Sequence, residues 1–405
     1  MKKIFALFIV SALITIQACT QNNPADTAFI NTEISAADKI ITEPVNAEKI
    51  PELIIMPDLF VESIIENMSI EQKIGQMFIL SARRDGSGVG ITGINQNTRD
   101  LINNYNIGGF ILFSENIATA EQTADYINDL QRESALPMFI AVDEEGGRVL
   151  RTEALDVPRA AAAMSIGDTG DAQNAYKSAR TIAGYLLPLG FNVNFAPVAD
   201  VFTNPQNTVI GDRAFSSEAD TTARMVEHFT RGLLDGNILP AVKHFPGHGD
   251  TLEDSHFGAA VTYKTLEELL ECELIPFKAG IKAGAPFVMV GHINAPNSGV
   301  DFTIPEPALF SPYLLQLILR GQLGFEGIII TDALDMGAVT KYYDSAETAV
   351  KAVLAGVDIL LMPADFEQAY TGIIQAAESG VIPVERIDES VRRILTVKYN
   401  AGIIE

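Results

Sequence analysis

The sequence predicts an α/β fold, a (β/α)8 barrel of the TIM type, and three observations support this prediction. Short apolar runs alternate with amphipathic stretches of helix length, as in parallel strands joined by crossover helices. About eight such runs recur, which is the number that a barrel requires. Polar residues follow several of the runs directly, and the corresponding loops of a barrel all open on one face. An open, doubly wound sheet is the alternative architecture.

The expected elements follow one another in a regular order. The candidate strands are 76–80, 107–113, 138–142, 191–198, 238–242, 287–290, 327–331 and 357–361. The expected helices are 120–132, 172–187, 219–234, 265–283, 345–354 and, at the end of the chain, 387–395. Helix-like spacing begins near Val61, so a single domain is expected over residues 58–405.

The first nineteen residues have the composition of an export signal. Two lysines precede an apolar run that ends at Ile16, and the small residue Ala18 stands before Cys19. This order resembles the bacterial lipoprotein box, so residues 1–19 are interpreted as a lipoprotein-type signal peptide that leaves Cys19 lipidated. A cleaved signal with an incidental cysteine is the alternative. The apolar run is shorter than the roughly 20 residues that cross a bilayer.

Residues 20–57 are rich in Asn, Ala, Thr, Glu and Pro and have no sustained apolar period. This composition is typical of a flexible tether. A lipid on Cys19 would attach the protein to a membrane, facing the periplasm or the cell exterior. Cys272, the other of the two cysteines, would then have no partner for an intramolecular disulfide, and it is expected inside the helix at 265–283.

The net charge of the chain argues against one class of partner, nucleic acids. The 405 residues include 52 acidic and 28 basic ones, for a formal net charge of -24. Most of such a surface would repel phosphates, so no nucleic-acid partner is expected. A neutral or locally recognised substrate is easier to reconcile with this charge.

The densest group of chemically active residues lies between residues 243 and 256, which hold three of the five histidines. Pro246, Gly247 and Gly249 exclude regular helix or strand there, so the polar side chains are expected on irregular backbone after a buried strand. Asp254 and His256 are two residues apart and are expected to hydrogen-bond, which would fix the imidazole tautomer and raise its basicity.

Six stretches of the sequence form an ordered set of motifs. They are GQMF (75–78), DEEGGRVLR (143–151), NFAPVAD (194–200), GDRAF (211–215), the histidine-rich stretch 243–256 and TDALDM (331–336). Together they resemble the β-N-acetylglucosaminidases of glycoside hydrolase family 3, in particular the enzymes that act on peptidoglycan fragments. The resemblance runs from about Pro57 to the carboxyl terminus and identifies residues 58–405 as the catalytic barrel of that family.

The resemblance implies a role for each matching residue. Asp332 would be the nucleophile that forms a covalent glycosyl-enzyme. His256 would be the general acid/base, oriented by Asp254, in place of the second carboxylate of most glycosidases; a histidine titrates near neutrality and suits both roles. The implied substrate contacts are Asp143, Arg151, Arg213, Lys243 and His244.

Other polar residues of these motifs are interpreted as structural. Glu144 and Glu145 are expected to face solvent or neighbouring arginines, and His248 is expected to shape its loop by hydrogen bonding. A zinc site built from the histidines is not expected, because their spacing matches no usual zinc pattern. No cofactor is expected.

Several functions remain open at this point. The β-glucosidases of the same family usually carry Trp after the nucleophile, whereas this chain has Ala333 there and no Trp at all. The expected activity is therefore release of terminal β-linked N-acetylglucosamine from peptidoglycan fragments or chitooligosaccharides. Phosphorolysis remains possible, because a neutral imidazole repels phosphate less than a carboxylate does. A lipoprotein that binds wall sugars without cleaving them is the rival from another class, although the joint presence of Asp254, His256 and Asp332 argues against it.

Overall fold

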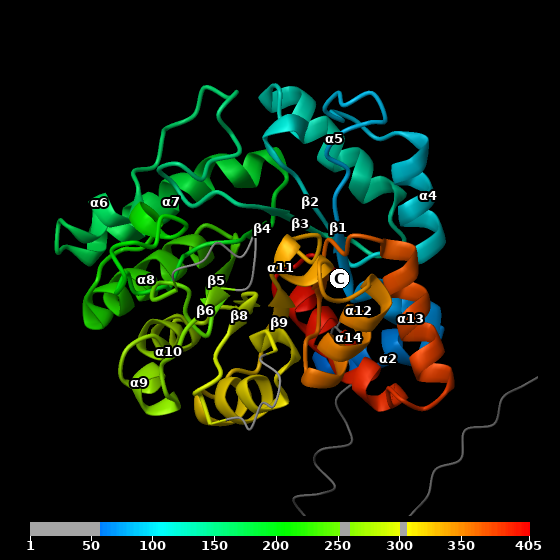
Figure 1. Ribbon diagram of the computed structural model, residues 1–405. Coiled ribbons are helices and arrows are strands. Elements are labelled where there is room, and N and C mark those ends of the chain that lie inside the picture. Colours follow the sequence, from blue (N-terminus) through cyan, green and yellow to red (C-terminus); the bar gives the residue numbers. More distant parts are fainter. Residues whose placement is uncertain (1–56, 252–259, 300–305) are drawn as a thin grey trace, which may run out of the picture. The chain divides into compact units, whose positions relative to one another are not determined.

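The computed structural model describes residues 57–251, 260–299 and 306–405 (Figure 1). Cys19, the predicted signal peptide and the predicted tether lie outside these ranges, and so do Asp254 and His256. All described residues belong to one unit, Met56–Glu405. No helix within the described ranges is long and apolar enough to span a membrane.

Eight parallel strands form the centre of this unit, in the spatial order β10-β1-β2-β3-β4-β5-β7-β9. Their bounds are β1 Phe78–Leu80, β2 Gly109–Ile111, β3 Phe139–Val142, β4 Val193–Asn194, β5 Leu239–Phe245, β7 Phe287–Val290, β9 Ile328–Thr331 and β10 Leu360–Leu361. Each lies within or overlaps one predicted strand. Two further short strands, β6 Ala260–Val261 and β8 Ile293–Asn294, pair with each other outside the main sheet.

The sheet closes on itself between β9 and β10, so the prediction of a barrel is confirmed and the open sheet is wrong. A parallel bridge joins Ile330 to Ile359. The backbone N–H of Thr331 donates to the carbonyl of Ile359 at 3.1 Å, and the N–H of Ile359 donates to the carbonyl of Ile329 at 3.1 Å. We call this junction the seam, residues 328–331 and 358–361.

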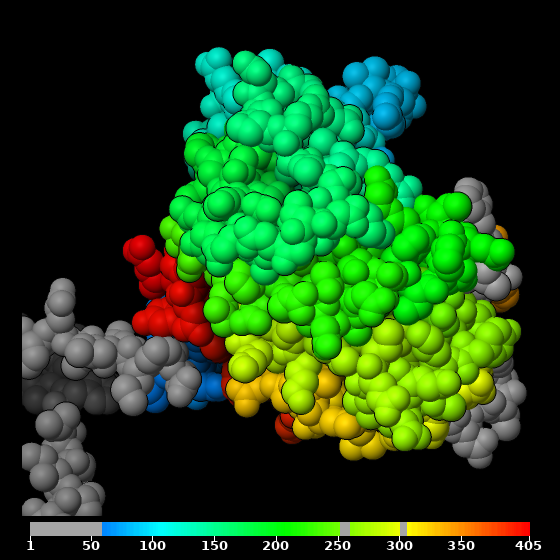
Figure 2. Space-filling model, turned by 90° about the vertical axis from the view of Figure 1, so that its left-hand side faces the viewer, coloured from blue at the N-terminus to red at the C-terminus, as the bar shows by residue number. Residues whose placement is uncertain are grey.

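Helices surround the barrel (Figure 1). Their bounds are α2 Pro57–Asn67, α3 Ile70–Gln76, α4 Gln96–Tyr105, α5 Ala120–Glu133, α6 Ala163–Gly167, α7 Ala172–Leu189, α8 Ala219–Leu234, α9 Leu266–Glu271, α10 Leu274–Lys282, α11 Gly337–Thr340, α12 Ser345–Ala355, α13 Phe366–Glu378 and α14 Val384–Asn400. Short helices of other types are η1 Ser114–Asn116, η2 Gly211–Arg213, η3 Ala308–Phe310 and the π-helix η4 Tyr313–Gln322. Helix α7 packs on α8 and α8 on α10, and Figure 2 shows these green to yellow segments side by side, as expected for successive βα repeats.

Local signals explain where the helices begin. The side chains of Thr119, Asp171 and Asp344 each accept a hydrogen bond from a backbone N–H in the first turn of α5, α7 and α12, which satisfies donors that the helix itself leaves unpaired. The single helix expected at 265–283 is wrong, because the chain breaks into α9 and α10. Cys272 ends α9, and the next residue, Glu273, turns its buried side chain to the ammonium of Lys264.

Apolar side chains fill the barrel interior. The four residues of β9 are all buried, and so are those of β3 and β7. The rings of Phe139 on β3 and Phe287 on β7 meet edge to face, with centroids 5.1 Å apart, although two strands separate β3 from β7 in the sheet. These rings therefore pack across the interior and hold opposite walls together.

Lys398 of α14 is a fully buried cation in this region. Its Nζ donates to Oε1 of Gln76 at 2.8 Å and lies 5.1 Å from the centroid of the Phe139 ring. Burial lowers the pKa of Lys398 to about 7, because the charged ammonium is poorly solvated there.

This lowered pKa makes the stability of the fold depend on pH. Above about pH 7 the folded state loses the Lys398 proton while the unfolded chain keeps it until about pH 10.4, so the free energy of unfolding should rise with pH in this window. We expect a gain of about 2 kcal/mol between pH 7 and pH 9. Urea unfolding at both values should show this gain, and the Lys398→Met variant should lose it, whereas the exposed Lys177→Met control should keep it. An equal gain in both variants would contradict the assignment to Lys398.

A second buried charged group lies at the seam. Asp358 immediately precedes the buried residue Ile359 and is fully buried. Its Oδ2 accepts from the N–H of Ile329 at 2.9 Å and from Nη2 of Arg320 at 2.5 Å. Its Oδ1 accepts from three more donors, which are Ser390 Oγ at 2.8 Å, Arg393 Nη1 at 3.0 Å and Arg386 Nη2 at 3.5 Å. One carboxylate thus joins the seam to η4 and α14.

Candidate active site

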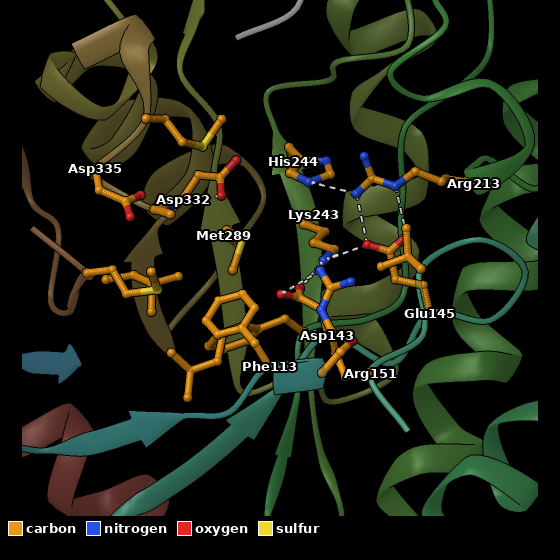
Figure 3. A pocket seen from close by; sticks show the side chains of 18 of the residues that line it. Phe113, Asp143, Glu145, Arg151, Arg213, Lys243, His244, Met289, Asp332 and Asp335 are labelled. Carbon is orange, nitrogen blue, oxygen red and sulfur yellow. Dashed lines mark hydrogen bonds and ion pairs between the residues drawn. The ribbon is translucent and has the colours of Figure 1, made fainter. Parts of the chain in front are cut away.

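A cavity of about 390 Å³ lies at the carboxyl ends of the barrel strands. Its size is in the range of small-molecule sites. Side chains that follow β2, β3 and β9, together with two from β5, contribute most of its polar groups (Figure 3). The charged residues and histidines of the lining are Arg83, Glu115, Asp143, Glu145, Arg151, Arg213, Lys243, His244, His248, Asp332 and Asp335.

Lys243 is at the centre of a buried ion-pair network on one wall of the cavity. Its Nζ lies 2.7 Å from Oδ1 of Asp143 and 2.7 Å from Oε1 of Glu145. Arg213 binds the same Glu145 carboxylate through two bonds of 2.8 Å, from Nε and Nη2. Arg151 Nη2 lies farther away, 3.8 Å from Asp143 Oδ2. Donors and acceptors are therefore fixed in a rigid array, as recognition of sugar hydroxyls requires.

Mutual pairing keeps these groups charged although they are buried. Burial alone would raise the pKa of Glu145, but Arg213 and Lys243 outweigh it and hold the pKa well below its usual range. Burial would lower the pKa of Lys243, but Asp143 and Glu145 raise it instead. The pKa of Arg213 is raised in the same way, chiefly by Glu145 against the effect of burial. The wall presents ionised side chains over the whole physiological pH range.

His244 is held by a second buried carboxylate, that of Asp200. Nδ1 of His244 lies 2.8 Å from Oδ2 of Asp200, and the backbone N–H groups of His244 and His248 donate to Oδ1 at 3.2 and 2.7 Å. Because the pKa of Asp200 is lowered, chiefly by His244 acting against burial, the carboxylate only accepts, and Nδ1 carries the hydrogen. Nε2 is left as the acceptor, and Arg213 Nη2 lies 3.4 Å from it.

A bulge explains why Lys243 and His244 both line the cavity. Side chains on a regular strand alternate between faces, but the pairing of β5 with β7 shifts register between Val242 and Phe245. The extra residue lets two neighbours face the same cavity. The strand continues to Phe245 rather than ending at Val242 as predicted.

Asp332 follows β9 on the opposite wall, with Met289 of β7 between it and the Lys243 side (Figure 3). Its N–H donates to the carbonyl of Val290 at 2.8 Å, and its Oδ1 accepts from the N–H of Ala333 at 2.8 Å. Burial would raise the pKa of Asp332, but His244, His292 and the Ala333 N–H outweigh it, so the pKa is lowered. The group is therefore an ionised carboxylate on a rigid backbone. No helix begins at Ala333, since α11 starts at Gly337.

The predicted dyad of Asp254 and His256 lies outside the described residues. The residues before that segment are firmly bound. Thr251 Oγ1 lies 2.8 Å from Nδ1 of the buried His248, and Asp250 accepts from Thr262 Oγ1 at 3.0 Å. Burial lowers the pKa of His248 to about 4, so this imidazole is neutral near pH 7, as suits a residue that shapes its loop by hydrogen bonding.

A comparison with protein families identifies the chain. The model of the family described as "Glycosyl hydrolase family 3 N terminal domain" matches residues 69–397. The chain belongs to glycosyl hydrolase family 3.

Individual members of family 3 are similar over most of the chain. "Beta-hexosaminidase A" of Pseudoalteromonas piscicida is 35% identical over 365 residues, which is 82% of this chain. "Beta-hexosaminidase" of Xylella fastidiosa (strain M23) is 34% identical over 280 residues, 68% of this chain and 82% of that protein. A solved β-N-acetylglucosaminidase of family 3 from Paenibacillus sp. str. FPU-7 superposes with a TM-score of 0.79 at 36% identity and covers 83% of this chain.

The family 3 chain spans only part of some relatives. It covers 61% of the Pseudoalteromonas piscicida protein and 63% of the Paenibacillus chain.

The structure brings most of the predicted site residues of this family 3 barrel into one cavity. They are Asp143, Arg151, Arg213, Lys243, His244 and Asp332. The expectation that Glu144 faces solvent or an arginine is wrong. It is fully buried, and its carboxylate accepts from Arg151 N at 2.7 Å, Thr152 Oγ1 at 2.6 Å and Tyr185 Oη at 2.9 Å. Glu145 does face an arginine, Arg213.

The residues of the cavity region that were not predicted from the sequence as parts of the site include two buried carboxylates and two lining side chains. Asp200 and Glu145 hold the histidine and the cations in place, and Arg83 and Phe113 line the cavity. Asp200 ends the NFAPVAD motif, and Glu145 follows Asp143 by two residues, so the motifs contained a signal for both. Within the described ranges no group of three or more His, Cys, Asp or Glu residues is arranged to hold a metal ion.

Proposed function

We propose that the protein is a retaining exo-β-N-acetylglucosaminidase that hydrolyses terminal β-linked N-acetylglucosamine from an oligosaccharide. The observation that carries the proposal is the position of the ionised Asp332 opposite the array around Lys243 (Figure 3). A sugar whose hydroxyls bind Asp143 and Lys243 would present its anomeric carbon to Asp332. The relatives named as hexosaminidases support the same activity.

The proposed reaction has two steps. An Asp332 oxygen attacks the anomeric carbon, and the bond from that carbon to the leaving oxygen breaks as His256 donates a proton to that oxygen. In the second step His256 takes a proton from water, the water oxygen attacks the anomeric carbon, and Asp332 leaves. Asp254 would orient the imidazole in both steps. The roles of Asp254 and His256 rest on the sequence motif.

The substrate contacts follow from the charges of the wall. Asp143 accepts hydrogen bonds from hydroxyls, whereas Lys243 and Arg151 donate them. The Nε2 acceptor of His244 and the nearby Arg213 offer one acceptor and one donor side by side. In the resting site these groups pair with each other, which holds them in place before a sugar binds.

The test compares 4-nitrophenyl β-N-acetylglucosaminide with the β-glucoside, using protein from residue 57 onward with and without phosphate. We expect turnover of the N-acetyl substrate alone and no acceleration by phosphate. Acceleration by phosphate with release of a sugar phosphate would instead indicate a phosphorylase. Sugar binding without turnover of either substrate would indicate a binding protein, the remaining rival.

We also propose that the protein is exported and anchored to a membrane by a lipid on Cys19, with residues 20–57 as a tether. The support is the order of charged, apolar and small residues before Cys19. Mass spectrometry of the mature amino terminus tests this. Acyl groups on Cys19, absent from the Cys19→Ala variant, are the expected result, and an unmodified terminus at another residue would exclude the anchor.

A further inference from the structure

His292 is a buried histidine whose imidazole contacts the turn that carries Asp332. It lies between β7 and β8, and its side chain is fully buried. Its Nε2 lies 2.8 Å from the carbonyl oxygen of Ala333. Because a carbonyl oxygen only accepts, Nε2 carries the hydrogen and donates it to this oxygen. This bond joins the segment after β7 to the residue that follows the proposed nucleophile.

The segment after β7 holds Asp332 and Ala333 at two points. The N–H of Asp332 donates to the carbonyl of Val290 at 2.8 Å, and two positions farther along His292 donates to the carbonyl of Ala333. The N–H of Met336 also approaches that carbonyl, at the longer distance of 3.3 Å. The N–H of Ala333 in turn donates to Oδ1 of Asp332 at 2.8 Å. None of the described residues donates to Oδ2, so Oδ2 is the oxygen left to attack a sugar.

The imidazole of His292 is a neutral donor. Its Nδ1 is buried and has no hydrogen-bond partner among the described residues, so a second proton on it would have no acceptor. Burial lowers the pKa of His292 although Asp332 acts to raise it. The other titratable side chains that act on His292 are His244, which lowers its pKa, and Asp335, which raises it. At neutral pH His292 therefore acts on Asp332 through the backbone of Ala333 and adds no positive charge.

From this geometry, and on the basis of the proposed function, we propose that His292 is a positioning residue that holds Asp332 at the distance and angle required for attack on the anomeric carbon. Attack depends steeply on the position of the nucleophile, and a shift of about 1 Å can lower the rate about hundredfold. His292 is not one of the residues that line the cavity. Its loss therefore slows bond formation and leaves the contacts to the sugar hydroxyls in place.

Three substitutions separate the hydrogen bond of His292 from its packing. The amide nitrogen of Gln is as many bonds from the main chain as Nε2 of His, so His292→Gln keeps a donor at the same reach. The amide of His292→Asn is one bond shorter, and His292→Leu has no donor. His228 on α8 is the matched control, because its Nδ1 lies 2.9 Å from the carbonyl oxygen of Arg224 and it lies outside the cavity lining.

The experiment measures kcat/KM for 4-nitrophenyl β-N-acetylglucosaminide and the inhibition constant of N-acetylglucosamine for each variant. We expect His292→Leu and His292→Asn to lower kcat/KM by about ten- to hundredfold and to change the inhibition constant by less than about twofold. His292→Gln should recover most of kcat/KM, because the donor to Ala333 is restored. His228→Leu should match the unaltered protein in both quantities.

The outcomes separate this inference from the proposed function. If His292→Leu does not fold, the pair of Gln and Asn variants decides, because the two amides differ in reach. Equal values of kcat/KM in this pair would overturn the assignment, and so would an inhibition constant that rises in parallel with the loss of kcat/KM, since that would indicate general damage to the cavity. If the unaltered protein does not cleave the substrate, the proposed function itself fails.

Discussion

Replacing Asp332 with alanine is expected to lower kcat for 4-nitrophenyl β-N-acetylglucosaminide by about ten-thousand-fold or more. The variant lacks the oxygen that would bond to the anomeric carbon, and the Lys243 network lies on the opposite wall (Figure 3). Sugar binding should survive, because the hydroxyl contacts are unchanged. Steady-state kinetics and calorimetric titration with N-acetylglucosamine measure the two effects separately.

A chemical rescue makes this prediction specific to a nucleophile. Azide is small enough to occupy the space left by the carboxylate, and its attack from that side should restore turnover and give the α-glycosyl azide. Asp129→Ala is the control, since Asp129 lies on α5 outside the cavity and pairs with Arg132. Turnover within tenfold of the unaltered protein in Asp332→Ala, or rescue that yields the β-azide, would rule out Asp332 as the nucleophile.

Replacing Asp358 with alanine is expected to lower the free energy of unfolding by about 3–5 kcal/mol. The carboxylate is fully buried, and the side chains of Arg320 and Arg386 beside it are 12% and 14% exposed. Without Asp358, Arg320 and Arg386 would lose their ion-pair partner, Arg393 would keep only Glu389 at 4.0 Å, and the N–H of Ile329 would lose its acceptor. Burial already lowers the pKa of Arg320 to about 10 even with Asp358 in place, which shows how costly this cation is to bury.

Guanidinium unfolding followed by circular dichroism measures this loss. Asp129→Ala again serves as the control and should change the free energy of unfolding by less than about 0.5 kcal/mol. A loss below about 1 kcal/mol in Asp358→Ala would mean that water or chain movement solvates the arginines. The free energy of unfolding of the Asp358→Asn variant should lie between those of Asp358→Ala and Asp129→Ala, because the amide oxygen still accepts one hydrogen bond.

The order of the barrel strands was predictable because buried parallel strands give short apolar runs. The carboxyl end of β5 was harder to predict from the sequence. Lys243 and His244 interrupt the apolar run, and polar residues of this kind usually indicate that a buried strand has ended. They remain in β5 because Asp143, Glu145 and Asp200 neutralise or orient them inside the protein. Pairing of this kind depends on residues distant in sequence, which a local pattern does not contain.

The residues of the candidate site were likewise predictable only in part. The positions of Asp143 and Asp332 directly after strands indicated binding or catalytic roles, and both residues lie in one cavity. The burial of Glu144 could not be predicted, because one of its donors, Tyr185, lies 41 positions away. Arg83 was overlooked because an arginine in a polar loop has no distinguishing local pattern. In the folded protein it lies against the Phe113 ring, which the guanidinium of Arg151 also approaches.

The seam gives the barrel a place where hydrogen exchange should reveal ligand binding. Its strands are joined by few backbone bonds, so the amides of Thr331 and Ile359 are expected to exchange through a local opening that requires less energy than global unfolding. Asp332 directly follows Thr331, whereas its own N–H is bonded to β7. A ligand that spans Asp332 and the Lys243 wall binds only when β9 is in register. Saturation with such a ligand should therefore slow exchange at the seam more than elsewhere in the barrel, and the protection factor would report occupancy without any turnover.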